Sequence, residues 1–364
     1  MTELGPPAAL VADAHRPNSV AGIRALGRAG VRVVALGRSR LAAGRWSRFA
    51  AARERGEPAD AAARVGPAVV YPGEETTIDA LLARPPDAPV ELPWPPRSLA
   101  PLRTKRELPA LAAASGLAAP ATLFDGAAGE LARARVSLPA VVKPARAVGA
   151  LLSARAVESG DELGALVDEL PPDEPVIAQE PVRGRLGSLA LVLDRDGTVV
   201  ARFQEEALRT WPAAAGSFAA TVSVAPDEEL VARAAAMLSA AGFWGLAQLD
   251  LVQRGDETVL LDVNPRFYFC MPLALACGVN LPAAWHAVVE GRPAGSPRPY
   301  PAGVGYRWLV GDLYAARHGH AGRLRRAGPR PRARAMWAAD DPLASALLTA
   351  AELTLPVRRR LRRR

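Results

Sequence analysis

Residues 242–266, GFWGLAQLDLVQRGDETVLLDVNPR, decide the fold that this chain is expected to adopt. Two runs of alternating apolar and polar residues flank the turn-forming segment Arg254 to Thr258, so the stretch is predicted to form a β-hairpin with a five-residue loop. A loop of that length places Asp250 opposite Asp262. Because successive side chains of a strand point to opposite faces, the apolar residues then share one face and the polar residues the other.

The two faces of this hairpin differ in chemistry. The apolar face is expected to be buried and comprises Ala247, Leu249, Leu251, Leu261 and Val263. The polar face comprises Gln248, Asp250, Asp262 and Asn264. Carboxylates on one sheet face repel each other unless a cation lies between them, and carboxylate and amide oxygens are ligands that suit Mg²⁺. The polar face therefore indicates a metal site, with a solvated polar strand face as the alternative.

The composition limits the class of protein. At 364 residues the chain is long enough for two or three domains with a sizeable core. Cys270 and Cys277 lie seven residues apart in an apolar stretch, on one face of an expected helix, which favours free thiols and a cytoplasmic location. The N-terminus lacks the pattern of a signal peptide and no apolar run reaches about 18 residues, which predicts a soluble protein.

The net charge of +8 is concentrated near the C-terminus. Residues 317–364 contain 13 arginines against three acidic residues, which leaves a net charge of −2 on the first 316 residues. A nearly neutral body does not indicate a specific nucleic-acid partner. The Arg-rich tail, residues 356–364, is expected to follow a docked helix as a disordered segment, with weak contact to an anionic surface as the alternative.

The first hundred residues show the pattern of a parallel sheet. A short apolar strand, Ala8 to Asp13, is followed by a helix at 18–29 and a second strand at 31–36, which together form a β-α-β unit. The turn between the first strand and the helix lacks the sequence GxGxxG, so NAD binding is not expected. A Pro-rich run, residues 85–101, ends this region and is expected to be a linker.

The sequence LLDVNPR, following GLAQLDLV, resembles the metal-binding end of the ATP-grasp superfamily, most closely its carboxylate–amine ligase and carbamoyl-phosphate-synthase-like branches. The resemblance implies that Asp250, Asp262 and Asn264 hold Mg²⁺, or alternatively Mn²⁺, on the phosphates of ATP. It also places Arg266 beside the phosphoryl group that is transferred. Members of the superfamily more often have glutamate at the two acidic positions.

The same resemblance implies the fold and its divisions. We expect an α/β and α+β chain in which a small N-terminal parallel-sheet domain, residues 1–100, precedes a two-subdomain ATP-grasp fold at residues 101–300. The subdomains divide near residue 176. Residues 301–364 are expected to form a C-terminal helical extension that ends in the Arg-rich tail.

Two lysines stand out because the other 43 basic residues of the chain are arginines. A retained lysine suggests a site that needs a compact ammonium group rather than a planar guanidinium. Lys105 lies just before the first helix expected in the ATP-grasp region, and Lys143 ends the strand LPAVVKP, residues 138–144. In the superfamily, lysines at these two places contact the nucleotide.

Three further segments are assigned by the resemblance. Residues 145–150 correspond to the loop over the β- and γ-phosphates, although Gly149 is the only glycine present. The hinge strand that reads the adenine edge corresponds to Gln179, Glu180, Pro181 and Val182. Arg209 corresponds to a basic residue that reaches the phosphates, with an ordinary surface charge as the alternative. Glu205 and Glu206 precede it where many members have a lysine, which would favour a cationic amine substrate.

The sequence therefore predicts an ADP-forming carboxylate–amine ligase. A carboxylate substrate would attack the γ-phosphorus of ATP to give an acyl phosphate, and an amine would then displace phosphate to form an amide. Catalysis would depend on Lys143, Arg209, Arg266 and the metal ion. Two alternatives stay open: a carbamoyl-phosphate-type kinase that acts on bicarbonate, and a catalytically degenerate ATP-binding regulatory protein. The substrates and the oligomeric state are left open.

Overall fold

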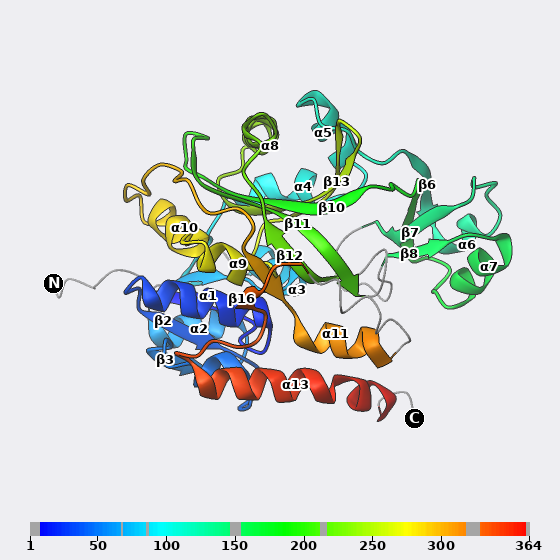
Figure 1. The fold of residues 1–364 in the computed structure, drawn as a ribbon. Helices are drawn as coiled ribbons and strands as arrows, with labels where there is room; N and C mark the ends of the chain where they lie inside the picture. Colours follow the sequence, from blue (N-terminus) through cyan, green and yellow to red (C-terminus); the bar gives the residue numbers. More distant parts are fainter. Residues whose placement is uncertain are drawn as a thin grey trace.

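The computed structural model describes residues 8–66, 68–84, 87–145, 154–211, 217–317 and 328–361, with side chains up to residue 354. The chain is a mixed α/β structure built on three sheets. A parallel sheet from the N-terminal part lies below a large, mostly antiparallel sheet, and a small antiparallel sheet projects to one side (Figure 1).

The N-terminal sheet has five parallel strands in the order β3-β2-β1-β4-β5. Its strands are β1 (Ala8–Val11), β2 (Val33–Leu36), β3 (Ala52–Glu54), β4 (Ala68–Tyr71) and β5 (Val90–Glu91). Its helices are α1 (Pro17–Arg28), the 3₁₀ turn η1 (Ala43–Trp46), α2 (Pro58–Val65) and α3 (Glu75–Leu82). The predicted β-α-β opening is confirmed by the parallel pairing of β1 with β2. Short, polar β3 has too little apolar alternation to be recognised in the sequence.

The Pro-rich run at 85–101 is not a free linker. The run contains β5, and after that strand it contains η2 (Pro96–Ser98) and the start of α4 (Leu99–Arg103). The indole of Trp94 is buried, and its Nε1 donates a hydrogen bond to the Pro265 carbonyl oxygen over 3.0 Å. Prolines stiffen this segment without keeping it away from the core, because its large apolar side chains are drawn inward.

The central sheet has seven strands in the order β14-β13-β10-β11-β12-β15-β16. Its strands are β10 (Arg185–Leu193), β11 (Val199–Trp211), β12 (Ser217–Ser223), β13 (Gly245–Arg254), β14 (Glu257–Asn264), β15 (Gly305–Arg307) and β16 (Pro331–Arg334). The helices around it are α5 (Leu108–Ala114), α8 (Glu228–Ala240), α9 (Met271–Ala276), α10 (Leu281–Val289) and α11 (Leu309–Ala315). Helix α8 is capped by Asp227, whose carboxylate accepts hydrogen bonds from the amides of Glu229 and Leu230, each over 3.1 Å.

The small sheet has the order β6-β9-β7-β8 and its own core. Its elements are β6 (Thr122–Ala127), α6 (Ala128–Leu131), β7 (Ala140–Pro144), β8 (Arg155–Val157), α7 (Gly160–Asp168) and β9 (Pro175–Gln179). Residues such as Leu131, Val142 and Val176 fill this core, whereas a single large cluster joins the N-terminal sheet to the central sheet. The small sheet is thus a separately packed lobe, seen at the right of Figure 1.

The register of the hairpin agrees with the sequence, but its loop does not. Asp250 pairs with Asp262, as predicted, while the turn contains only Gly255 and Asp256. The five-residue loop is therefore wrong, and a β-bulge at Leu261 supplies the missing residue that restores the register. Because of that bulge, Leu260 rather than Leu261 lies in the buried core.

The C-terminal part is more than a helical extension. β15 and β16 add two strands to the central sheet, and α13 (Pro342–Leu361) then lies along the N-terminal layer and near α11 (Figure 1). Buried Arg24 of α1 donates from Nε to Oδ2 of Asp341 over 2.8 Å, which fixes the start of α13. No helix in the described part of the chain is long and apolar enough to cross a membrane.

Candidate active site

The two paired aspartates lie on the polar face of the β13–β14 hairpin, next to two amide side chains. Asn264 donates from Nδ2 to Asp250 Oδ2 over 3.0 Å and to Gln248 Oε1 over 2.9 Å. Gln248 in turn donates from Nε2 to Asp250 Oδ1 over 2.8 Å. The face thus gathers two carboxylates, the ligands that a hard divalent cation prefers, beside two amide side chains that turn their NH₂ groups toward Asp250. The two carboxylates fit Mg²⁺.

Both lysines of the chain converge on these aspartates. Lys105, whose side chain is 7% exposed, forms an ion pair with Asp262 Oδ1. Its backbone amide donates to the carbonyl oxygen of Ala145 over 3.3 Å, which ties the segment between α4 and α5 to the end of β7. Lys143 lies on β7, close enough for its charge to act on Asp262 and Lys105. The small lobe and the segment before α5 therefore contribute one cation each to a common site.

Burial and charge move the pKa values of these groups in different directions. Burial and the neighbouring charge of Asp262 raise the pKa of Asp250. Burial also opposes ionisation of Asp262, but the charge and hydrogen bond of Lys105 outweigh it and hold the pKa of Asp262 below its usual range. Burial, then the charge of Lys105, lowers the pKa of Lys143 to about 8. Asp262 is therefore the more firmly ionised of the two carboxylates.

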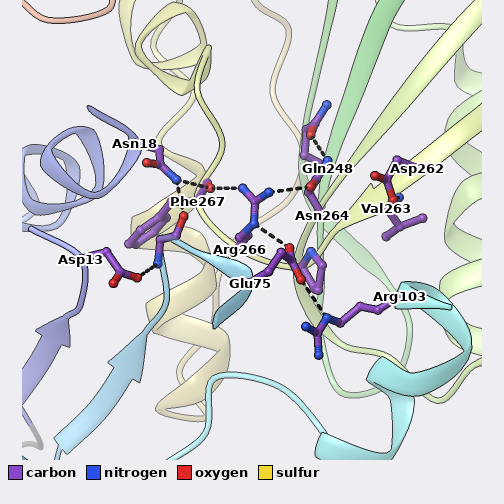
Figure 2. Close-up of polar contacts among 12 residues, drawn as sticks. Asp13, Asn18, Glu75, Arg103, Gln248, Asp262, Val263, Asn264, Arg266 and Phe267 are labelled. Carbon is purple, nitrogen blue, oxygen red and sulfur yellow. Dashed lines mark hydrogen bonds and ion pairs between the residues drawn. The ribbon is translucent and has the colours of Figure 1, made fainter. Parts of the chain in front are cut away.

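Arg266 lies just after β14 and links the hairpin to the N-terminal layer (Figure 2). Its Nη2 donates to Asn264 Oδ1 over 2.8 Å, and its Nε donates to Glu75 Oε1 over 2.7 Å. The other oxygen of Glu75 accepts a hydrogen bond of 2.8 Å from Arg103 Nε. Glu75 thus lies between two guanidinium groups at the start of α3. Sequence reasoning missed it, although its place just after a parallel strand was an available signal.

A second contact joins the same two layers. Asn18, at the start of α1, donates from Nδ2 to the carbonyl oxygens of Phe267 and Gly73 over 2.8 and 2.7 Å. The amide of Gly73 donates to Asp13 Oδ2 over 3.0 Å. The carboxyl edge of the N-terminal sheet is therefore hydrogen-bonded to the end of the strand that carries Asn264.

The segment expected to contact adenine, residues 179–182, begins at the end of β9 and leads out of the small lobe. Gln179, at the end of β9, is buried, and its Oε1 has no hydrogen-bond partner among the described residues. The amide of Glu180 donates to the carbonyl oxygen of Ala121 over 3.0 Å. Pro181 and Val182 follow as half-buried irregular backbone. A buried acceptor without a donor is costly unless a ligand supplies one.

Arg209 stands apart from this group. Arg209 is buried on β11 and pairs with the buried carboxylate of Asp312, its Nε lying 2.9 Å from Oδ1. Arg307 pairs with the other oxygen of that carboxylate. The guanidinium of Arg209 is therefore engaged where β11 meets α11. Gly149 lies outside the described residues.

Glu205 is a buried carboxylate in the same cross-strand row as Asp250. Ser188 pairs with Asp250 on one side and with Glu205 on the other. The carboxyl group accepts hydrogen bonds from Ser188 Oγ over 3.0 Å and from Thr221 Oγ1 over 2.8 Å. Burial raises the pKa of Glu205 to about 8. Glu206, by contrast, faces the exposed Arg185 at 3.5 Å. Of the two neighbouring glutamates, Glu205 thus has its carboxyl group in the interior of the protein and Glu206 has its carboxyl group at the surface.

A family model matches the part of the chain that contains these residues. Residues 112–268 match the family described as the ATP-grasp domain, a span that includes Lys143, the adenine segment and the hairpin with both aspartates. The chain carries an ATP-grasp domain. The mixed fold, with its N-terminal parallel sheet and antiparallel sheets, agrees with this family. A comparison with curated proteins finds no match.

Solved ATP-grasp structures share the fold at low sequence identity. N5-carboxyaminoimidazole ribonucleotide synthetase from Thermus thermophilus is 20% identical, with a TM-score of 0.63, over 81% of this chain and 81% of that one. The biotin carboxylase domain of 2-oxoglutarate carboxylase from Hydrogenobacter thermophilus, solved with MgADP, ADP and bicarbonate, is 13% identical, with a TM-score of 0.64, over 82% and 72%. Rhizobium etli pyruvate carboxylase is 16% identical, with a TM-score of 0.62, over 82% of this chain but 30% of that one. At these identities the likeness is one of fold.

Proposed function

We propose that this protein is an ADP-forming ligase that joins a carboxylate to an amine through an acyl phosphate. The observation that carries the proposal is the meeting of Lys105 and Lys143 with Asp250 and Asp262 at one half-buried sheet face. Two carboxylates and two ammonium groups in one place are suited to hold a metal and a polyphosphate together. The ATP-grasp family match over residues 112–268 supports ATP as the phosphoryl donor.

Each residue of the site is given a role in this proposal. Asp250, Asp262 and Asn264 would hold Mg²⁺, which when bound neutralises charge on the phosphates and orients them. Lys105 and Lys143 would contact the phosphate oxygens. The unpaired Oε1 of Gln179 supports a contact with the adenine amino group, beside backbone contacts from Glu180 to Val182. Gly149 is proposed to belong to the loop over the phosphates.

Arg266 is proposed to stabilise the phosphoryl group during transfer. Glu75 and Asn264 hold its Nε and Nη2, which fixes the plane of the guanidinium before any substrate binds. Arg209 is left out of the transfer step, because its guanidinium is already paired with buried Asp312, which it shares with Arg307. We propose instead that Arg209 stabilises the join between β11 and α11.

The proposed reaction has two steps. An oxygen of the carboxylate attacks the γ-phosphorus, the bond to the bridging oxygen breaks, and ADP leaves with that electron pair. The amine nitrogen then attacks the acyl carbon, the carbon–oxygen bond to phosphate breaks, and the nitrogen loses a proton to solvent. One carboxylate oxygen therefore leaves in the phosphate.

That oxygen transfer is the test. The purified chain is incubated with Mg-ATP and pools of amino acids and other small carboxylates and amines, and ADP formation is followed. For any active pair, a carboxylate labelled with ¹⁸O should transfer one label to phosphate, which ³¹P NMR detects. Phosphate without label would contradict the acyl phosphate. A lack of ADP formation with every pool, despite Mg-ATP binding, would favour the degenerate regulatory protein.

Bicarbonate is the second candidate for the carboxylate. The reason is the similarity in fold to the biotin carboxylase domain that was solved with bicarbonate and MgADP. In that case ADP formation should depend on bicarbonate as the carboxylate, and labelled bicarbonate should enter a carbamoyl or carboxylated product when ammonia or another nucleophile is supplied to displace phosphate. Product analysis separates this reaction from amide formation.

A further inference from the structure

Four arginines surround one cavity in the N-terminal layer, away from the paired aspartates. The cavity has a volume of about 360 Å³ and is lined by Arg40, Arg45, Trp46, Arg53 and Arg55. Arg40 follows β2, Arg45 and Trp46 belong to η1, and Arg53 and Arg55 lie on and just after β3. The guanidinium of Arg53 lies over the indole of Trp46, 4.6 Å from the ring centroid. The indole Nε1 donates to the carbonyl oxygen of Arg40 over 2.9 Å, which fixes the ring.

None of these four guanidinium groups forms an ion pair with a carboxylate in the described part of the chain. The nearest acid in sequence, Glu54, is paired with Arg64 at 2.9 Å. Nε of Arg45 is buried without an acceptor, and Nη1 reaches only the carbonyl oxygen of Ser39 at 3.3 Å. Burial, then the charges of Arg55 and Arg53, lowers the pKa of Arg45. Cations that repel one another around a cavity, with a buried donor left over, indicate a missing anion.

The place of this cavity in the sheet is that of a ligand site. In open parallel α/β sheets, ligands bind beyond the carboxyl ends of the strands, and the cavity lies at the carboxyl ends of β2 and β3. The amide of Gly44 donates to the Ala14 carbonyl oxygen over 2.7 Å, so η1 packs beside the end of β1. β4, whose end leads to Glu75, is three strand spacings from β3, roughly 14 Å at about 4.8 Å each.

We propose that this cavity binds the phosphate group of a phosphorylated small molecule. The binding of an anion follows from the arginine cluster alone. The further step, which rests on the ligase function proposed above, is that this molecule is the substrate and that its other end reaches Arg266. A phosphomonoester carries a charge of about −1.5 to −2 and three acceptor oxygens, which suit several guanidinium forks. A monocarboxylate brings one charge to four cations. Trp46 offers an aromatic surface for the rest of the ligand.

The test uses two probes that differ only in their anionic group. Phenyl phosphate and benzoate are titrated by calorimetry into the full chain without nucleotide, at low and high salt. Phenyl phosphate should bind at least tenfold more tightly than benzoate, and its affinity should fall with salt. The double variant Arg53→Gln/Arg55→Gln should bind it at least tenfold more weakly. Both side chains are exposed, so the fold should tolerate the change.

Arg38→Gln is the matched control. Arg38 is an exposed arginine of the same loop that pairs with Glu57 at 3.1 Å and does not line the cavity. Its loss should leave phenyl phosphate affinity within twofold, and Arg40→Gln serves as a second test variant if the double variant unfolds. Equal binding by wild type and the cavity variants, equal loss in Arg38→Gln, or tighter binding of benzoate would each overturn the proposal. Phenyl phosphate binding without any ADP formation would leave the anion site standing and count against the ligase function alone.

Discussion

Asp262 has two tasks in this structure, because it is proposed as a metal ligand and it also neutralises the buried ammonium of Lys105. Asp262→Ala should therefore lower ADP formation at least a hundredfold, about 3 kcal/mol in activation free energy. It should also lower the melting temperature, since a buried charge loses its partner. Asp256→Ala, in the exposed turn of the same hairpin, is the control and should change neither. Full activity of Asp262→Ala would contradict the metal assignment.

Lys143 should couple nucleotide binding to protons. Because burial lowers the pKa of the free lysine to about 8, part of the protein has a neutral lysine at pH 8. Phosphate oxygens favour the ammonium form and raise that pKa, so binding takes up a proton and ATP affinity falls as the pH rises above about 8. Calorimetry in two buffers of different ionisation enthalpy measures this uptake.

Lys143→Arg should remove that proton uptake and weaken ATP binding at least tenfold. The guanidinium stays charged throughout, but it is wider than the ammonium group and does not fit the same buried space. Near-normal ATP affinity in this variant would mean that the retention of two lysines in an Arg-rich chain carries no information about the site.

Helix α3 acts on the site through its first residue, because Glu75 holds Arg266 in place. Glu75→Gln keeps the shape of the side chain but removes the negative charge that Arg266 and Arg103 share. We expect kcat to fall about tenfold while the KM for ATP changes little. The reason is that Glu75 contacts Arg266, which is proposed to act in the transfer step, and contacts none of the residues proposed to hold adenine or the metal. Glu75→Asp should restore part of the activity. Equal effects of Glu75→Gln and Glu75→Asp on stability, without a fall in kcat, would indicate a purely structural ion pair.

The two layers of the molecule meet where α1 packs against Phe267. A Cβ atom added to Gly22 would lie 2.4 Å from Cε2 of that ring, which is fully buried beside Tyr71 and Trp285. Gly22→Ala gains about 1 kcal/mol of helix propensity but overpacks a rigid contact at about 1–3 kcal/mol. The variant should be less stable and less active, because Phe267 follows Arg266.

Gly164→Ala on α7 is the matched control, because a Cβ atom added there would have no atom within 4 Å. This variant should raise the free energy of unfolding, measured by denaturant unfolding, by about 0.5–1 kcal/mol.

The Arg-rich C-terminal tail leads to a prediction about how the whole protein binds to an anionic membrane surface. α13 runs to Leu361, and the side chains from residue 355 onward lie outside the described part. If the tail binds anionic vesicles, pelleting should occur at low salt, weaken at high salt and disappear when residues 356–364 are removed. ADP formation should be unaffected by the truncation. Equal pelleting of the truncated chain would exclude the tail as the binding segment.

The sequence by itself determined those features of the fold that depend only on residues close together in the chain. Alternation along 242–266 predicts the hairpin, because strand periodicity is a local property. The pairing of Asp250 with Asp262 was derived from a five-residue loop, and it is observed because a β-bulge offsets the shorter turn. The division of the chain near residues 100, 176 and 300 stays a prediction, as do the roles of the site residues. The loop length was wrong, because a bulge and a shorter turn give the same register as a longer loop.

The tertiary structure decided which distant charges meet. Arg266 contacts Glu75 across 191 positions, and Arg209 contacts Asp312 across 103. No periodic pattern contains such pairs, since they depend on how α3 and α11 pack against the sheets. The same packing places four arginines, from η1, from β3 and from the segments that follow β2 and β3, around one cavity. Local alternation fixes the face on which a side chain lies, whereas burial and the approach of separate elements fix the partner that its charge finds.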